Sequence, residues 1–317
     1  MRPRPVQRVP PAVRAFLRRE LAAGRMVLFT GAGFSSLARD KSGKRHVPTG
    51  APLADELWRL CFGGDKRDGS SLADLYAHAL ASRPRPLAAL IEQRLRVDER
   101  TLPSLYETWL TMPWRRVYTL NVDDLATVTA ARFRLPRRVR ALSALREGVE
   151  DTMLRVDRDQ LDIIHLNGVV DDGPERITFS TMQYAGRLAQ RCAFYSQLVC
   201  DFTEYPVLFV GTKLDEMPLW QHLELSGARE KLDGSPPGLL VTQQVTRARQ
   251  CVLESLNIRW VAMDVRTFAD EVLAPLRDEV VEPGLRALAR TRAVHRAPAA
   301  RGSREIDESR SSATDLH

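Results

Sequence analysis

Short apolar runs that end in small or polar residues recur along this chain of 317 residues, and they predict buried strands. The first run covers residues 26–30 and leads directly into Gly31-Ala32-Gly33. Strands that are buried on both faces have continuous apolar sequences of this kind, which are typical of parallel sheets in α/β proteins. Further strands that end in polar groups are expected within Val117–Asp124, Ile163–Gly168 and Val207–Asp215, and two more strands at Gly238–Thr242 and Trp260–Val265.

Apolar residues at helical spacing lie between these runs. Residues 11–23 and 53–61 have this pattern, and residues 70–112 are mostly helical, with the prolines of Arg83–Pro86 dividing two helices. We therefore expect an α/β fold: a Rossmann-like parallel sheet flanked by helices, with an inserted helical subdomain at about residues 53–112. Other expected elements are a helix from Asp124 to about Arg134, a short strand at Ile177–Ser180, a long helix at Met182–Glu204 and a closing helix at Thr267–Leu276.

The Gly31-Ala32-Gly33 turn, with Ser35 after it, is a candidate phosphate-binding site. Glycines let the backbone turn tightly and approach a ligand, and the free amides at the start of the following helix favour an anion. The third glycine of the full dinucleotide motif is missing, as is the acidic residue at the end of a second strand. A tight strand-to-helix turn without a ligand is the alternative.

Polar residues also follow three later strands, at the point where each strand ends. They are Asn121 and Asp123 after the first, His165, Asn167 and Gly168 around the end of the second, and Gly211, Thr212 and Asp215 after the third. Ligands of open α/β sheets bind outside the carboxyl ends of the strands. These ends therefore predict one shared pocket.

The order of these segments resembles the sirtuin family, which carries a GAG-x-S turn, a TQN-x-D strand end, an HG pair and a GTS-type strand end. The corresponding segments here are Gly31–Ser35, Thr119–Asp123, Asn167-Gly168 and Gly211–Leu214. The closer resemblance is to divergent bacterial sirtuin-like domains of anti-phage defence proteins, and it runs from about Met26 to about Phe268. It implies NAD+ as substrate, held by Gly31, Ala32, Gly33, Ser35, Asp123, Gly168, Gly211, Thr212 and Asp215.

The chain departs from the family pattern in two places. Asn167 stands where the family has its catalytic histidine, and Leu120 replaces the glutamine of the TQN motif. Asparagine is no general base near neutral pH, although it hydrogen-bonds a ribose hydroxyl. His165 lies two residues earlier, on the same strand face and about 7 Å away, and could replace the missing imidazole. The alternative is a structural His165 bonded to the backbone.

Three residues are the catalytic candidates: Asn121, His165 and Asn167. Asn121 would orient the ribose or the attacking water. Asp123 would order the loop or polarise a neighbour, although capping of the next helix is the simpler role for it. No metal ligand is expected, because Cys61, Cys192, Cys200 and Cys251 include no C-x2-C pair and thus no zinc ribbon.

The expected organisation has three parts. Residues 1–25 form an N-terminal segment with a covering helix, residues 26–280 the sirtuin-like NAD-binding domain, and residues 281–317 a basic, disordered tail or linker. The polar segment Leu37–Gly50 follows the phosphate turn, and it is expected to be a lid or else a mobile surface insertion.

The charge and composition limit which partners the protein is expected to bind and where in the cell it is expected to lie. The formal net charge is +7, with much of the excess at the two ends, so nucleic acid would bind only indirectly or through the basic tail. No apolar run approaches the about 18 residues that span a membrane, and there is no secretory signal, which favours a cytoplasmic location. A homo-oligomer or a sensor protein partner is expected from the resemblance.

Three functions are open at this point. The first is an NAD+ hydrolase that cleaves the nicotinamide–ribose bond and acts as an effector in anti-phage defence by NAD+ depletion. The second is an NAD+- or ADP-ribose-binding sensor or assembly module without turnover, because Asn167 replaces the usual histidine. A protein deacylase ranks last, because the zinc-bearing subdomain that frames the peptide groove is missing.

Overall fold

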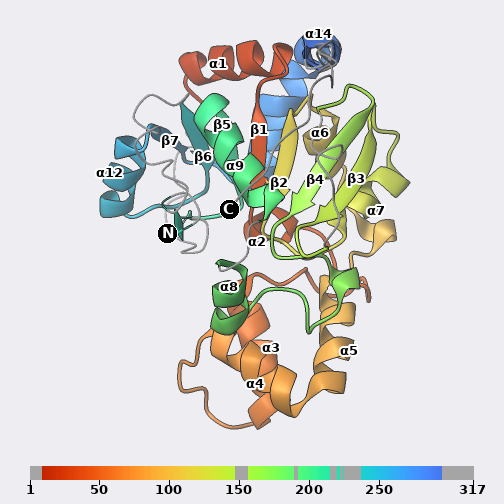
Figure 1. Ribbon diagram of the computed structural model, residues 1–317, viewed down its shortest axis with the longest axis vertical. Coiled ribbons are helices and arrows are strands. Elements are labelled where there is room, and N and C mark those ends of the chain that lie inside the picture. The colour runs from red at the N-terminus through yellow and green to blue at the C-terminus, as the bar shows by residue number, and fades with distance from the viewer. Residues whose placement is uncertain are drawn as a thin grey trace, which may run out of the picture.

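The computed structural model describes residues 9–146, 156–188, 192–214, 220–221, 224 and 237–294. At its centre is a parallel sheet of seven strands in the order β3-β4-β2-β1-β5-β6-β7 (Figure 1). The Rossmann-like α/β fold is thus confirmed. The strands are β1 (Val27–Thr30), β2 (Arg116–Thr119), β3 (Arg138–Ser143), β4 (Gln160–His165), β5 (Val207–Val210), β6 (Gly238–Val241) and β7 (Ile258–Val261).

The direction in which strands are added to the sheet reverses beside β1. Strand β1 pairs with β2 on one side and with β5 on the other. The chain first builds the half that contains β2, β3 and β4, and then returns to add β5, β6 and β7. Open α/β sheets bind ligands at such a reversal, outside the carboxyl ends of the strands. Gly31 and Gly211, which follow β1 and β5, both lie at this point.

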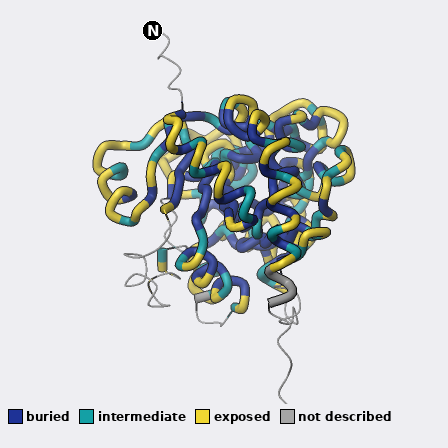
Figure 2. The backbone as a smooth tube through the Cα atoms, turned by 90° about the horizontal axis from the view of Figure 1, so that it is seen from above, coloured by how far each residue is buried: buried dark blue, intermediate teal, exposed yellow. Residues whose placement is uncertain are grey.

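Helices cover both faces of the sheet, because alternate strand residues point to opposite sides. Val27 and Phe29 pack in one cluster with residues of α9 (Ala193–Glu204) and α12 (Arg247–Ser255). Leu28 and Val117 belong to the cluster on the other face, together with residues of α6 (Leu105–Thr111) and α7 (Leu125–Arg132). In Figure 2 the buried residues lie in the interior and the exposed residues on the outer turns.

The C-terminal helices extend further than the sequence predicts. Helix α13 (Val265–Phe268) continues through the π-helical turn η4 (Ala269–Leu273) into α14 (Ala274–Val294), which packs along α1 (Pro11–Ala22). The prediction of disorder from residue 281 is wrong for residues 281–294, because Leu285 and Leu288 are buried there. Residues 295–317 lie outside the described part of the chain. None of the described helices is long and apolar enough to cross a membrane.

The elements between β1 and β2 are helical. Besides α2 (Ala32–Ser35) and α6 they are α3 (Gly50–Phe62), α4 (Leu72–Ser82), α5 (Pro84–Leu95) and the short η1 (Glu99–Thr101). Helix α5 begins at Pro84, where proline is favoured because its missing amide hydrogen is not needed. In Figure 1, α3, α4 and α5 form a group that lies apart from the sheet, on the side of its carboxyl ends.

Two predicted elements after β4 differ from the structure. Residues 177–180 form no strand: the amides of Phe179 and Ser180 donate to Gln183 Oε1 at 3.0 and 2.9 Å and so are not available for a ladder. The predicted helix at 182–204 is two helices, α8 (Thr181–Leu188) and α9, and the backbone is extended at Cys192. This break lets α8 lie between the sheet and α3–α4 in Figure 1.

Candidate functional site

The turn after β1 packs directly against the end of β5. A Cβ atom on Gly211 would lie 2.1 Å from the amide nitrogen of Phe34, and one on Gly31 would lie 2.9 Å from the main-chain oxygen of Gly211. Gly211 also has a φ of +68°, which favours glycine. These glycines are therefore explained by the approach of two backbone segments.

The amides of this turn are already engaged. Gly31 N donates to Val210 O at 3.1 Å, Gly33 N to Gly211 O at 2.8 Å, and Phe34 N to Gly31 O at 2.8 Å. The glycine pattern predicts free amides for a phosphate here, and this prediction is wrong for Gly31, Gly33 and Phe34. Helix α2 has only four residues, so its dipole is small. Of the two interpretations, a tight strand-to-helix turn fits this segment better than a phosphate-binding turn.

Asn121, which follows β2, links the β1 turn to α2. Its Nδ2 donates to the main-chain oxygen of Gly31 at 3.0 Å and to Ser35 Oγ at 2.9 Å. Its own amide donates to Thr119 Oγ1 at 3.0 Å. The sequence-predicted residues Gly31, Ser35 and Asn121 are thus brought together at the carboxyl edge of the sheet.

His165, the last residue of β4, joins the same group. Its Nδ1 lies 2.8 Å from the main-chain oxygen of Asn121. A carbonyl oxygen only accepts, so Nδ1 carries the proton and Nε2 is left as an acceptor. Burial lowers the pKa of His165 to about 4, so the ring is neutral near pH 7. The predicted backbone contact is present, and it leaves a neutral imidazole with a free lone pair.

Asp123 supplies the negative group of the site. Burial raises the pKa of its carboxyl to about 6, although hydrogen bonds from Ser35 and from the amide of Leu125 work against this rise. The Leu125 amide lies 3.2 Å from Asp123 Oδ1, at the start of α7, so Asp123 does contribute to the beginning of that helix. Near pH 7 most of the carboxyl is ionised.

These groups surround a small cavity below the strand ends. Its volume is about 20 Å³, which is room for a water molecule. The surface of the cavity is mostly apolar, and the polar residues that contribute to its wall are Thr30, Ser35, Tyr106, Thr119, Asn121, Asp123, Thr129 and His165. His165 and Asp123 therefore border the same water-sized space.

Asn167 lies beyond the end of β4, in the turn that follows it. Its Nδ2 donates to Leu120 O at 3.0 Å, and its buried Oδ1 has no partner among the described residues. The predicted alternation with His165 does not apply, because the strand ends at His165. The two side chains nevertheless reach neighbouring carbonyls, those of Leu120 and Asn121.

The turn after Asn167 is held by a carboxylate. Gly168 has a φ of +88°, and a Cβ there would lie 2.4 Å from Leu145 Cδ1. Asp172 accepts from Ser143 Oγ at 2.5 Å and from the amide of Val169 at 2.9 Å. Burial raises the pKa of Asp172, but these hydrogen bonds and the Arg146 guanidinium outweigh burial and lower it below its usual value. Gly168 is thus a packing and turn residue.

The residues after β5 contribute a turn as well. Thr212 is buried, and its Oγ1 accepts from the amide of Leu214 at 2.8 Å. Leu214 has a φ of +56°, which this hydrogen bond helps to hold. Asp215 lies outside the described residues. The third predicted strand end therefore meets the site through the contact of Gly211 with Gly31 and Gly33.

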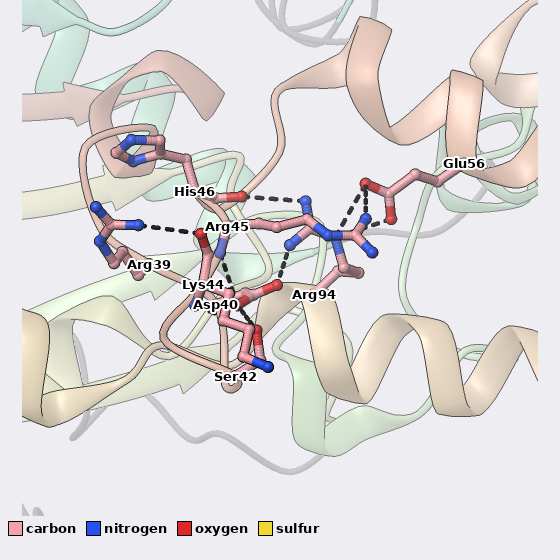
Figure 3. A network of polar contacts seen from close by, with 8 residues as sticks. All are labelled: Arg39, Asp40, Ser42, Lys44, Arg45, His46, Glu56 and Arg94. Atoms are coloured by element: carbon pink, nitrogen blue, oxygen red, sulfur yellow. Dashed lines mark hydrogen bonds and ion pairs between the residues drawn. The ribbon is translucent and has the colours of Figure 1, made fainter.

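The loop after α2 is fastened to the helical insertion by ion pairs (Figure 3). Asp40 is buried and pairs with Arg94 of α5, whose Nε also donates to Glu56 of α3 at 2.8 Å. Arg94 Nη2 donates to His46 O at 3.1 Å, in the same loop. The expected lid or mobile insertion is instead a loop with a buried anchor.

Two site residues escape sequence reasoning. Tyr106 of α6 donates its hydroxyl to Phe34 O at 2.8 Å and lines the cavity. Its position at helical spacing predicts only a core residue of the helix. Arg96, just after α5, pairs with Asp124 and Asp171, which follow β2 and β4. These partners lie far apart in the sequence, so no local pattern predicts the ion pairs.

A comparison with family models identifies the class of domain. The model of the SIR2-like domain matches residues 115–261, from one residue before β2 to the end of β7. The matched range includes Asn121, His165 and Asn167. Over this range the chain is similar to SIR2-like domains, which supports a sirtuin-like domain and suggests an NAD-related function. No curated protein matches the chain.

None of the cysteines lines the small cavity. Cys61 and Cys192 are partly exposed, Cys200 and Cys251 are exposed, and all four are free thiols. Among the described residues, no group of three or more His, Cys, Asp or Glu side chains is arranged to hold a metal ion.

Proposed function

We propose that this domain cleaves the bond between nicotinamide and ribose in NAD+ by hydrolysis. The observation that carries the proposal is the pairing of His165 with Asn121 beside Asp123. It combines a neutral imidazole, an ionisable carboxyl and a water-sized cavity at the carboxyl edge of a sirtuin-like sheet.

The proposed hydrolysis requires few catalytic side chains. Nicotinamide leaves as a neutral molecule, so no acid is needed, while positive charge develops on the ribose. The Asp123 carboxylate would stabilise that charge. Water attacks the anomeric carbon, the carbon–nitrogen bond breaks, and the proton of the water passes to His165 Nε2 and then to solvent. The products are ADP-ribose, nicotinamide and a proton.

The residues at the site fit a ribose better than they fit a phosphate. Asn167 Oδ1 is a buried acceptor without a partner among the described residues, which suits a hydroxyl donor. The amides of Gly31 and Gly33, in contrast, already donate to backbone carbonyls. The cavity takes a water molecule, so the nucleotide would lie outside it, at the carboxyl edge of the sheet.

A second candidate is an NAD+- or ADP-ribose-binding module without turnover. Asn167 favours it, because no imidazole stands beside Gly168. The low pKa of His165 favours it too, since a weak base takes a proton from water slowly. The resemblance to domains of anti-phage defence proteins supports a role in NAD+ depletion for the first candidate and in sensing or assembly for the second.

The test is release of nicotinamide from NAD+ by the purified protein at high concentration, followed by chromatography. We expect nicotinamide and ADP-ribose from the wild type and none from Asn121→Ala. This variant keeps the carbonyl that binds His165, but it loses the Nδ2 hydrogen bonds to Gly31 O and to Ser35, the partner of Asp123. Gln160→Ala is the matched control, because it loses two side-chain hydrogen bonds at the opposite end of β4. Binding of NAD+ without release would favour the second candidate. A wild type that neither binds NAD+ nor releases nicotinamide would contradict both candidate functions.

A further inference from the structure

Arg96 connects the helical insertion to the ends of two strands. It follows α5 directly, and its guanidinium pairs with Asp124 at 3.3 Å and with Asp171. Asp124 comes after β2, and Asp171 lies in η3 (Val170–Asp172), after β4. Glu92 of α5 accepts from Arg96 Nε at 3.0 Å and so orients the guanidinium. One side chain of the insertion therefore reaches both of the loops that carry catalytic candidates.

Backbone hydrogen bonds join the same three segments. The amide of Val97 donates to Asp124 Oδ1 at 2.8 Å, so this carboxylate is held by Arg96 and by the residue that follows it. The amide of Val170 donates to Val122 O at 2.7 Å and links the loop after β4 to the loop after β2. The end of α5 and the two loops thus form one connected unit.

The charge of Asp124 acts on the neighbouring Asp123. Burial raises the pKa of Asp123 to about 6, and the negative charge of Asp124 adds to this rise. Arg96 is always charged, so its ion pair with Asp124 offsets that negative charge. The other titratable side chains in the cavity wall are Tyr106 and His165. Both are neutral near pH 7, because burial raises the pKa of Tyr106 and lowers that of His165 to about 4.

We propose that Arg96 is a positioning residue for the cleavage of NAD+: it fastens the helical insertion to the loops after β2 and β4 and offsets the charge of Asp124, so that Asp123 stays ionised in the site. Arg96 itself does not bind the substrate, because each of its three guanidinium nitrogens donates to a carboxylate.

The proposed role makes the site depend on where the insertion lies. Displacement of α5 from the sheet would remove the positive charge of Arg96 and leave Asp124 without its ion pair. The carboxylate of Asp123 would then be harder to form, and the reaction would slow. The inference rests on the proposed function, and it adds a means of control to the same site.

The experiment measures nicotinamide release at saturating NAD+ as a function of pH for the wild type, Arg96→Met and Asp124→Asn. Both variants break the same ion pair, but the first removes a positive charge and the second a negative one. We expect the acid limb of the profile to move up by about half a pH unit in Arg96→Met and down by about the same amount in Asp124→Asn. A merely structural role would lower the rate in both variants and leave both limbs in place.

Two further variants separate the charge from the contact. Arg96→Lys keeps the positive charge, so its acid limb should stay at the wild-type position. Tyr76→Phe is the matched control, because Tyr76 of α4 donates its hydroxyl to Pro174 O at 2.6 Å and so fastens the insertion to the segment after η3. The variant loses this hydrogen bond without a change of charge, and its limb should stay in place as well.

The outcomes distinguish the two proposals. Acid limbs that stay in place in Arg96→Met and Asp124→Asn, or that move in the same direction, would overturn the inference while leaving the proposed function intact. A shift in Arg96→Lys equal to that in Arg96→Met would overturn it too. A wild type that releases no nicotinamide would contradict the proposed function itself, and the inference with it.

Discussion

His165 and Asn121 are joined by a hydrogen bond of 2.8 Å between Nδ1 and the main-chain oxygen, which ties the end of β4 to the end of β2. The same bond fixes the imidazole tautomer. It leaves Nε2 as the acceptor in a ring that burial keeps neutral. A contact that holds the fold together therefore also prepares the base of the proposed reaction.

The first prediction concerns the stability of the fold in acid. The pKa of His165 is about 4 in the folded state, against 6.5 for an unperturbed histidine. The contribution of the neutral ring to the free energy of unfolding is therefore present above pH 6.5 and is lost as the pH falls toward 4. We expect the wild type to lose about 3 kcal/mol more than His165→Gln between pH 6.5 and pH 4. Urea denaturation at the two pH values measures this difference, and parallel losses in both proteins would contradict it.

The second prediction concerns Asp123 and the pH dependence of NAD+ cleavage. Burial raises its pKa to about 6, so the carboxylate that stabilises the ribose cation is lost as the pH falls through that value. The rate of nicotinamide release should fall with it. Asp123→Asn should lower the rate at neutral pH about 100-fold and remove this limb of the profile. An unchanged limb in the variant would assign the titration to another group.

The third prediction concerns the contact of the two glycine turns. Gly211→Ala places a Cβ 2.1 Å from Phe34 N at a positive φ, and should destabilise the protein by more than about 3 kcal/mol. Gly63→Ala is the matched control, with a φ of +65° and nothing within 4 Å, and should cost about 1 kcal/mol. Thermal unfolding compares the two, and similar losses would show that backbone strain alone explains Gly211.

The sequence predicts the sheet well, and the reasons are local. Most strands contain a short apolar run that is buried on both faces, as at Val27–Thr30 and Val207–Val210. The edge strand β3 is charged and partly exposed, and it is not among the strands that the sequence predicts. The end of α14 is missed, because its apolar residues are widely spaced among arginines, and Leu285 and Leu288 are buried in a cluster with Val156 from a distant segment. The break at Cys192 is missed too, since the residues around it suit a helix.

Only part of the candidate site could be predicted from the sequence. Asn121, Asp123 and His165 are found because polar residues at strand ends meet at one edge of a parallel sheet. The engaged amides of Gly31 and Gly33 could not be found, because they depend on the approach of Gly211 from a distant segment.

The fourth prediction concerns the anchored loop after α2. Arg94→Met leaves Asp40 buried without its ion pair and should cost about 3 kcal/mol in the free energy of unfolding. Arg96→Met, two residues further on, breaks ion pairs that are partly exposed and should cost about 1 kcal/mol or less. Urea denaturation of both variants tests this, and equal costs would mean that burial of the Asp40 pair is unimportant.

The fifth prediction concerns the residue beside Gly168. Asn167→His restores an imidazole at the position where the sirtuin family has its catalytic histidine, and it should raise the rate of nicotinamide release about tenfold or more. No gain, with NAD+ binding intact, would mean that a side chain beside Gly168 does not reach the reacting water, and it would contradict this prediction.

The most direct test of the proposed chemistry is the rate of nicotinamide release from NAD+ by the wild type and by His165→Gln at neutral pH. Glutamine keeps a donor for Asn121 O but has no ring nitrogen to accept a proton, so we expect a loss of at least about 100-fold with the fold intact. Release at the wild-type rate by the variant would contradict the assignment of His165 as the base of the reaction.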